Sequence, residues 1–362
     1  MSLRDFVLTV FPVPSPLAPP AAGIDISSGS VKSIVLAEHG GHAHLQSFFE
    51  TPLPEGVVRG GDIEQRDRIV EILRSIRLRT GIRSAHACLP ERKAYIYEVI
   101  VPADAKDLKA GVEYDFEAHV PLPPGEAIYA FQPIRRTEAG TVVSVTAYAK
   151  RVVNEYISVF ADAGIHLRSL EVESSALVRA VLRGADLEST VMVIDFGRKT
   201  TRIAIAEQGV VAFTATVDIG GDTLSSAIMK NFNVPEEEAE KLKNERGFLM
   251  NKENKDLVDA LMATVSIVKE EVARHLSYWN NPPADEPPRR PVEKIVVCGG
   301  NANLRGFPEY LEGAAGIPVS VVNAWTNAFS LDEYIPAMPF SVSLEYATAI
   351  GLALRGLPHR PW

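Results

Sequence analysis

Two segments of the chain repeat one pattern of apolar and polar positions. Each has a short apolar run that closes on an aspartate, a tight turn of small or hydroxylated residues, and a second apolar run. The first copy starts at Gly23 and reads GIDISSGSVKSIVLAEHG, and the second starts at Val193 and reads VIDFGRKTTRIAIAEQG. Apolar runs joined by such turns predict β-hairpins. Because the whole unit recurs, we expect a duplicated domain whose copies face each other across a cleft.

The two turns carry groups suited to binding phosphate. Asp25 and Asp195 close the first strand of each copy, and Ser, Thr and Gly residues follow them. Main-chain N–H groups of a tight turn, helped by hydroxyls, can bind an anion. The two carboxylates would then hold Mg²⁺ through water, because this strongly hydrated ion prefers oxygen ligands. Asp is also common in ordinary turns, so the prediction rests on the repetition of the whole unit.

A third segment, further along the chain, has a similar character. Lys294 to Cys298 reads as a buried strand, and Gly299, Gly300 and Asn301 turn the chain. Adjacent glycines let the main chain approach a ligand closely, although such a pair is also typical of a plain structural turn. Its position after the second hairpin favours a ligand-binding role.

Other periodicities predict the remaining elements of an α/β fold. Alternating residues between the two copies predict strands over residues 95–101, 127–133 and 141–149. Helices are expected over residues 104–119 and 152–163, and residues 222–280 read as a mostly helical stretch. The Pro-rich segment that follows, residues 281–291, is expected to be a flexible surface linker.

Composition indicates a globular protein with substantial cores. The chain has 362 residues, 46% of them apolar, and this length favours two or three domains. A net charge of −9 with both signs spread along the chain argues against nucleic-acid binding. The two cysteines, Cys88 and Cys298, lie in apolar runs and are expected to be reduced thiols of a cytoplasmic protein. Prolines interrupt the apolar N-terminus, so we expect no signal peptide or membrane helix there, and any membrane contact to be indirect.

Taken in this order, the three segments resemble the phosphate 1, phosphate 2 and adenosine motifs of the actin, Hsp70 and sugar-kinase superfamily. The resemblance implies a duplicated actin-like (ribonuclease H-like) ATPase fold, with two lobes around a nucleotide cleft. In the first copy it assigns nucleotide binding to Asp25, Ser28, Gly29, Ser30 and Lys32. In the later segments it assigns nucleotide binding to Asp195, Gly197, Thr200, Thr201, Gly299, Gly300 and Asn301. Arg198 and Lys199 depart from the pattern, because many members of the superfamily carry smaller residues there.

Within the superfamily, three stretches resemble the type IV pilus assembly PilM family, which is related to the cell-division protein FtsA. They are residues 217–222 with the helix 237–243, residues 317–325, and the closing helix 346–356. The resemblance implies that Gly220, Gly221, Glu238 and Lys241 contact the nucleotide and that Glu173 orients the attacking water. Glu173 is also typical of an exposed residue at a helix start, and neighbouring Glu171 could be confused with it.

The resemblance also implies a function. The chain would bind ATP or ADP with Mg²⁺, be at most a weak ATPase, and act as a cytoplasmic scaffold of type IV pilus assembly. It would be peripheral to the inner membrane through the N-terminal cytoplasmic peptide of the protein PilN, bound at an inserted subdomain of the 1C type. Other pilus components and self-association remain open.

Two alternatives belong to the same superfamily: a filament-forming FtsA-like protein and a small-molecule kinase. A kinase needs a substrate pocket with a catalytic base, which no recognisable segment supplies. Filament-forming relatives usually end in a membrane-targeting helix, whereas this chain ends at Trp362. The predicted organisation is a tail (1–22), lobe one or subdomain 1A (23–84, 151–188 and 340–362), subdomain 1C (85–150), lobe two or subdomain 2A (189–221 and 292–339), subdomain 2B (222–280) and a linker (281–291).

Overall fold

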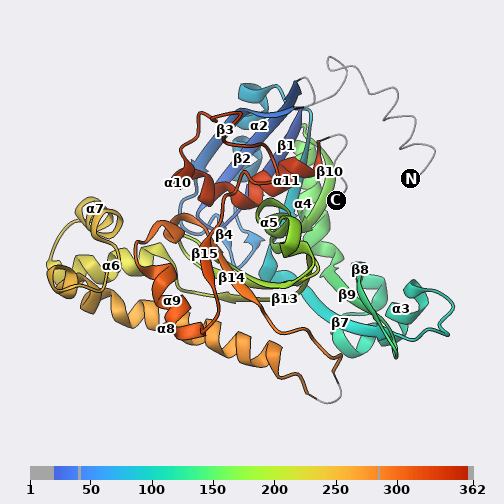
Figure 1. Cartoon of the computed structure of the whole chain (residues 1–362). Helices are drawn as coiled ribbons and strands as arrows, with labels where there is room; N and C mark the ends of the chain where they lie inside the picture. Colours follow the sequence, from blue (N-terminus) through green and yellow to red (C-terminus); the bar gives the residue numbers. More distant parts are fainter. Residues whose placement is uncertain (1–19, 40–41, 284–285, 358–362) are drawn as a thin grey trace.

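The computed structural model describes residues 20–39, 42–283 and 286–357. Most of the predicted tail (residues 1–19) and residues 358–362 of lobe one therefore lie outside the described residues. Two five-stranded sheets form the body of the molecule (Figure 1).

The two sheets have the same strand order and the same strand directions. The first runs β10-β6-β1-β2-β3 and the second β15-β14-β11-β12-β13. In each, the central strand pairs antiparallel with the second strand of its hairpin and parallel with the strand on its other side. The first sheet contains β1 (Ala21–Ile26), β2 (Ser30–His39), β3 (His42–Pro52), β6 (Ser84–Leu89) and β10 (His166–Val172). The second contains β11 (Thr190–Phe196), β12 (Thr201–Glu207), β13 (Val210–Val217), β14 (Lys294–Cys298) and β15 (Val319–Val321). The repeated sequence pattern is therefore a repeated sheet.

Four helices enclose the first sheet. Alternation along its strands sends one set of apolar side chains, including Ile24 and Val35, into a core with α2 (Arg66–Thr80) and α4 (Lys150–Asp162). On the opposite face, α5 (Glu173–Val181) and α11 (Ala347–Arg355) pack closely together. Their approach depends on Gly351, because a Cβ there would lie 1.7 Å from the carbonyl oxygen of Ala176. Residues of α5 and α11 belong to a core cluster that also contains β11 and β14, so this layer joins the two sheets.

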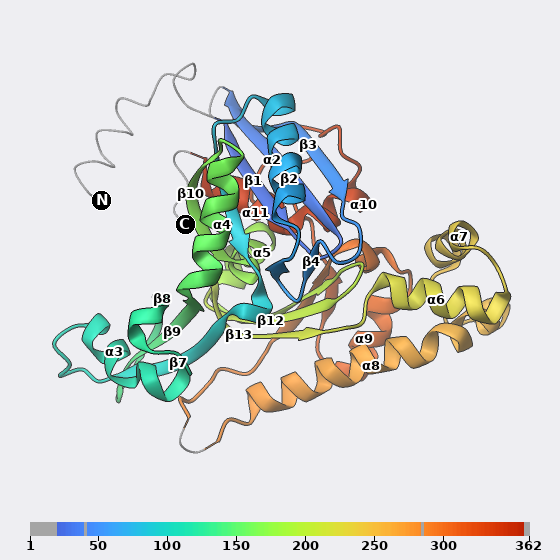
Figure 2. The ribbon, with the colours of Figure 1, turned by 180° about the vertical axis from the view of Figure 1, so that it is seen from behind.

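A group of helices extends from the second sheet to one side (Figures 1 and 2). They are α6 (Gly221–Phe232), α7 (Glu236–Arg246), α8 (Lys255–Asn280) and α9 (Phe307–Ala315). In α8, buried residues recur every three or four positions, from Leu257 to Trp279, which is the pattern of an amphipathic helix. Among the described residues, no helix is both long and apolar enough to cross a membrane.

The part of the chain between the two repeated segments contains a separate three-stranded sheet. This sheet lies at the opposite end of the molecule from α7 (Figure 1). It consists of β7 (Tyr95–Val101), β9 (Gly140–Ala149) and β8 (Ala127–Thr137), in that order, with α3 (Leu108–His119) on one face. Helix α3 starts later than the predicted residue 104, because the Asp107 carboxylate accepts a hydrogen bond from the Ala110 N–H (2.8 Å) and caps it. The opposite face of β8 is exposed at Ile128, Ala130 and Gln132.

This inserted sheet contacts the second lobe directly. The Ser144 hydroxyl donates to the carbonyl of Val211 on β13 (2.6 Å), and Arg135 of β8 pairs with buried Glu207 at the end of β12. Arg289, in the segment predicted to be a flexible linker, donates to Glu98 of β7 (2.9 Å) and lies over the ring of Trp279. Part of that segment is therefore anchored between the inserted sheet and α8. The short strands β4 (Val58–Arg59) and β5 (Asp62–Ile63) and the short helix α10 (Phe340–Ser343) complete the fold.

Candidate functional site

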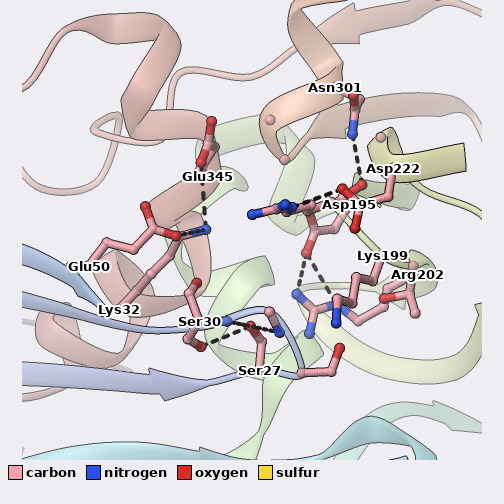
Figure 3. Close-up of a pocket in the computed structure, with 18 of the residues that line it drawn as sticks. Ser27, Ser30, Lys32, Glu50, Asp195, Lys199, Arg202, Asp222, Asn301 and Glu345 are labelled. Atoms are coloured by element: carbon pink, nitrogen blue, oxygen red, sulfur yellow. Dashed lines mark hydrogen bonds and ion pairs between the residues drawn. The ribbon is translucent and has the colours of Figure 1, made fainter. Parts of the chain in front are cut away.

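A pocket of about 390 Å³ lies where the two sheets meet (Figure 3). Both hairpin turns contribute to its lining, as do the start of α6, one face of α7 and the turn after β14. Asp25 and Asp195 both reach it, although they are far apart in the sequence. The structure brings together in this lining the predicted residues Asp25, Ser28, Gly29, Ser30, Lys32, Asp195, Gly197, Thr200, Gly221, Gly299, Gly300 and Asn301.

Three predicted residues lie behind the pocket wall. The Thr201 hydroxyl is fully buried and donates to the carbonyl of Ile219 (2.7 Å). Gly220 packs under the second turn, where an added Cβ would lie 2.4 Å from the carbonyl oxygen of Arg198. Glu173 is buried at the start of α5, outside the pocket lining. These three residues support the pocket wall rather than form its surface.

Two further predicted residues lie on another face of the predicted helix. The lining contains Glu236, Glu240, Lys243 and Asn244 of α7, whereas Glu238 and Lys241 are outside it and exposed. At 3.6 residues per turn, Glu236, Glu240 and Lys243 are spaced by three or four and share one helix face, whereas Glu238 lies on the opposite face and Lys241 lies between the two. The buried positions Ala239 and Lys243 determine which face turns inward.

The first turn is held together by the side chain of one of its own residues, Ser27. The Ser27 hydroxyl accepts hydrogen bonds from the N–H groups of Ser30 (3.2 Å) and Gly29 (3.4 Å), and donates to the Ser30 carbonyl (3.0 Å). Ser27 is absent from the sequence-based candidates, although a serine that binds the main chain two and three residues ahead is a known turn pattern. An added Cβ on Gly29 would meet nothing within 4 Å, so the turn is open towards the pocket.

The second turn is held by neighbouring elements. The N–H groups of Gly221 and Asp222 donate to the carbonyls of Gly197 (3.1 Å) and Arg198 (2.9 Å), which fastens the start of α6 to the turn. The Asn301 side-chain amide, from the turn after β14, also donates to the Gly197 carbonyl (2.7 Å). Asn301 therefore positions the turn, and the second turn depends on two distant segments for its shape.

The two unusual cations of the second turn behave differently. Arg198 donates to Asp222 (2.8 Å) and lies 3.8 Å from Glu236, so its charge is paired with carboxylates at the starts of α6 and α7. Lys199 lines the pocket and has no ion-pair partner among the described residues. Of the two cations, Lys199 is the one whose charge is available to an anionic ligand.

Lys32 lies on the opposite side of the pocket. Its ammonium group is 3.5 Å from Glu50 and 3.6 Å from Glu345, and its side chain is 16% exposed (Figure 3). Both carboxylates also line the pocket and were not predicted. These contacts are long and partly solvated, which leaves Lys32 able to turn towards a ligand.

Arg202 lines the pocket and joins the two halves of the molecule. Its guanidinium donates twice to Oδ2 of Asp195, on the neighbouring strand, and lies 2.7 Å from Glu173 at the start of α5. Burial raises the pKa of Glu173 to about 7, although the Arg202 charge acts in the opposite direction. Burial alone would lower the pKa of Arg202, but Glu173, Asp195 and Asp25 raise it well above its usual value. Arg202 is thus a permanent cation among buried carboxylates.

In this arrangement the residues do not fit a Mg²⁺ ion shared by Asp25 and Asp195. One oxygen of Asp195 accepts from Arg202, and the other lies so close to Gly299 that a Cβ there would be 2.4 Å from it. Asp25 accepts a hydrogen bond from the Cys88 thiol (3.1 Å) and is only 5% exposed. A divalent ion bound to both carboxylates would have to share this space with the Arg202 charge.

The spacing of charged residues in the two hairpins is a sequence signal for Arg202. Lys32 follows Asp25 by seven residues, and Arg202 follows Asp195 by the same interval. The strand registers agree, since Asp25 pairs with Lys32 and Asp195 with Arg202. Glu171 is separated from the site, because it pairs with Arg179 (2.6 Å) and Arg355 (2.7 Å).

A family model described as type IV pilus assembly protein PilM matches residues 23–357. Among curated proteins, the cell division protein FtsA of Streptococcus pneumoniae is 27% identical over 172 residues, which cover 44% of this chain and 38% of that protein. The chain thus matches well under half the length of that relative.

Solved structures share the architecture. The structure of a PilM-PilN type IV pilus biogenesis complex superposes with a TM-score of 0.73 at 21% identity, covering 93% of this chain and 98% of that chain. The ADP-bound structure of MreB5 from Spiroplasma citri gives a TM-score of 0.55 at 15% identity, with 92% and 94% of the chains covered. The ethanolamine utilization protein EutJ of Carboxydothermus hydrogenoformans gives 0.54 at 19% identity, with 97% and 95% covered. Together with the repeated sheets, these matches confirm the predicted duplicated actin-like fold.

Proposed function

The chain belongs to the type IV pilus assembly protein PilM family, whose model spans residues 23–357, and from this premise we propose that it is a nucleotide-dependent scaffold of pilus assembly. In this proposal, ATP or ADP binds between the two lobes and changes their separation. The change in turn alters how the inserted sheet binds a membrane partner.

The observation that supports this proposal best is the meeting of the two hairpin turns in one pocket. The pocket volume of about 390 Å³ suits a small-molecule ligand. Lys32 from one lobe and Lys199 from the other lie in its lining, where each could contact a phosphate oxygen. Lys243 and Asn244 of α7, with the turn at Gly300, would flank the nucleoside. One structural relative with this fold, MreB5, was solved with ADP.

The proposed partner is the N-terminal cytoplasmic peptide of PilN, bound at the inserted sheet. A PilM relative was solved as a complex with PilN, which supports this choice of partner. Within the described part of residues 85–150, the exposed large apolar side chains are Tyr114 on α3 and Ile128 on β8, on opposite faces of the insertion. We place the peptide on the face with Ile128, since the other sheet face is already covered by α3.

The contacts between the inserted sheet and the second lobe could transmit lobe movement. Arg135 of β8 pairs with Glu207 at the end of β12, the strand that also carries Arg202. The Ser144 hydroxyl binds the Val211 carbonyl on β13. A change in the angle between the lobes would therefore move the sheet that receives the peptide.

The test is a titration of a PilN N-terminal peptide into the full chain by calorimetry, with and without ATP, alongside a phosphate-release assay. We expect peptide binding whose affinity changes at least threefold when ATP is present, with little phosphate released. Ile128→Glu should weaken binding at least tenfold, and Tyr114→Glu, on the opposite face, is the matched control.

Each result has a clear consequence. Equal peptide affinity with and without ATP would contradict the proposed coupling. If only Tyr114→Glu weakens binding, the peptide binds at α3 rather than at β8. Transfer of phosphate from ATP to a small substrate would replace the scaffold proposal with the kinase alternative.

A further inference from the structure

Arg202 connects the two halves of the molecule at the place where both pocket aspartates converge. It extends from β12 of the second lobe, contacts Asp195 of the same lobe, and reaches Glu173 at the start of α5, which packs on the first sheet. Its side chain is 19% exposed and lines the pocket. The contact to Glu173 therefore holds the lobes together through one charged side chain.

The surroundings of Arg202 are strongly acidic. Asp25, Glu173 and Asp195 are all less than 8% exposed. One ligand atom from each of Asp25, Cys88 and Glu173 lies within 4.8 Å of the others, and the Glu91 carboxylate is beside them, bound to the Ser174 N–H (3.1 Å). Buried carboxylates at this spacing repel one another unless a cation is present. Arg202 is the cation that the structure provides.

One oxygen of each of these carboxylates is already engaged by the protein. Asp195 accepts twice from Arg202, and Glu173 accepts from Arg202 and from the Glu91 N–H (3.2 Å). Mg²⁺ keeps several waters in a nearly octahedral shell, which requires space and free oxygen atoms. Arg202 already engages Oδ2 of Asp195, so a hydrated ion at this oxygen would have to displace the guanidinium.

We propose that Arg202 takes the role of a divalent cation in this pocket, so that the chain binds a nucleoside diphosphate or triphosphate without a metal ion held by its aspartates. The inference rests on the proposed nucleotide binding. Arg202 is a positioning residue, because it joins Asp195 to Glu173 across the lobes. It also keeps the Glu173 carboxylate engaged in an ion pair, which accounts for the slow or absent hydrolysis expected of this scaffold.

Two independent measurements test this inference. The first needs no nucleotide: binding of Mn²⁺ to the full chain is followed by electron paramagnetic resonance. We expect Arg202→Gln to bind Mn²⁺ at least tenfold more tightly than the wild type, because it leaves three buried carboxylates without their cation. The double variant Arg202→Gln with Asp195→Asn should lose that gain.

The second measurement uses the wild type, so it stands even if Arg202→Gln does not fold. The affinity for a fluorescent ADP analogue is measured in Mg²⁺ and in EDTA. We expect the two affinities to agree within about threefold. Lys32→Gln, which changes the cation at the equivalent position of the first hairpin, should weaken both affinities and leave their ratio unchanged. A folded Arg202→Gln variant should become dependent on Mg²⁺ by at least tenfold.

The inference is overturned if wild-type affinity falls more than thirtyfold in EDTA and Asp195→Asn abolishes that difference. It is also overturned if the wild type binds one Mn²⁺ ion as tightly as Arg202→Gln does. A wild type that binds no nucleotide in either buffer contradicts the proposed function instead. In that case the Mn²⁺ measurement still decides what Arg202 does.

Discussion

The two hairpins of the molecule share one backbone plan but use it differently. Each has an aspartate at the end of its first strand and a cation paired with it on the second strand, Asp25 with Lys32 and Asp195 with Arg202. Lys32 extends outward to the pocket carboxylates Glu50 and Glu345. Arg202 instead folds back onto its own aspartate and reaches across to Glu173. The same strand position therefore carries a cation that contacts pocket carboxylates in one copy and joins the lobes in the other.

The difference follows from the chemistry of the two side chains. An ammonium is a compact, strongly hydrated charge, which favours contact with solvent and mobile ligands. A guanidinium presents several donors in one plane and is more weakly hydrated, so it can satisfy two buried carboxylates at once. Lys32 and Arg202 behave as this contrast predicts. Each is paired with the aspartate of its own hairpin, but Lys32 lies among partly solvated groups and Arg202 among buried carboxylates.

The largest expected effect concerns the two aspartates. Asp195→Asn removes a carboxylate from a buried guanidinium, and we expect the free energy of unfolding to fall by about 3 kcal/mol. Asp25→Asn should change it by less than about 1 kcal/mol, because the hydrogen-bond partner of Asp25 is a neutral thiol. Urea denaturation of both variants gives the comparison. Equal losses would mean that the two hairpins carry equivalent electrostatic roles.

The fold could be predicted from the sequence where local patterns determine it. The repeat, the strand 294–298 and the strand ends near Asp25 and Asp195, each one residue later than predicted, depend on the pattern of neighbouring residues and on turn chemistry, so the sequence alone indicates them. Helix α3 starts later than the apolar pattern predicts, because capping by Asp107 sets its first residue.

The parts of the site that were missed depend on how elements dock. The face of α7 that turns inward is determined by packing around Ala239 and Lys243, so the predicted residues Glu238 and Lys241 lie on a helix that lines the pocket but outside the lining itself. The ion pair between Arg202 and Glu173 joins different lobes, and the pattern of apolar and polar residues along the sequence does not predict such a contact. The equal seven-residue spacing to Lys32 and Arg202 was the one available clue.

An intermediate effect is expected at the tip of the second turn. Lys199→Gln should weaken ATP binding about tenfold, equal to about 1.4 kcal/mol, because this ammonium has no competing partner among the described residues. Arg198→Gln should weaken it less than threefold, since Asp222 and Glu236 already engage that guanidinium. Calorimetry with ATP measures both. A larger loss for Arg198→Gln would show that the helix contacts yield to the nucleotide.

The smallest expected effect concerns how each turn keeps its shape. Ser27 binds the N–H groups of Gly29 and Ser30, so Ser27→Ala should cost about 1 kcal/mol of stability and speed amide exchange at those two positions. Ser28→Ala, one residue along, is the matched control, because its hydroxyl has no hydrogen-bond partner among the described residues. The second turn should be unaffected in both variants, since Asn301 and the start of α6 hold it from outside. If Ser27→Ala also speeds exchange at Gly221 and Asp222, the turns are coupled through the pocket, and the first would no longer be a self-contained unit.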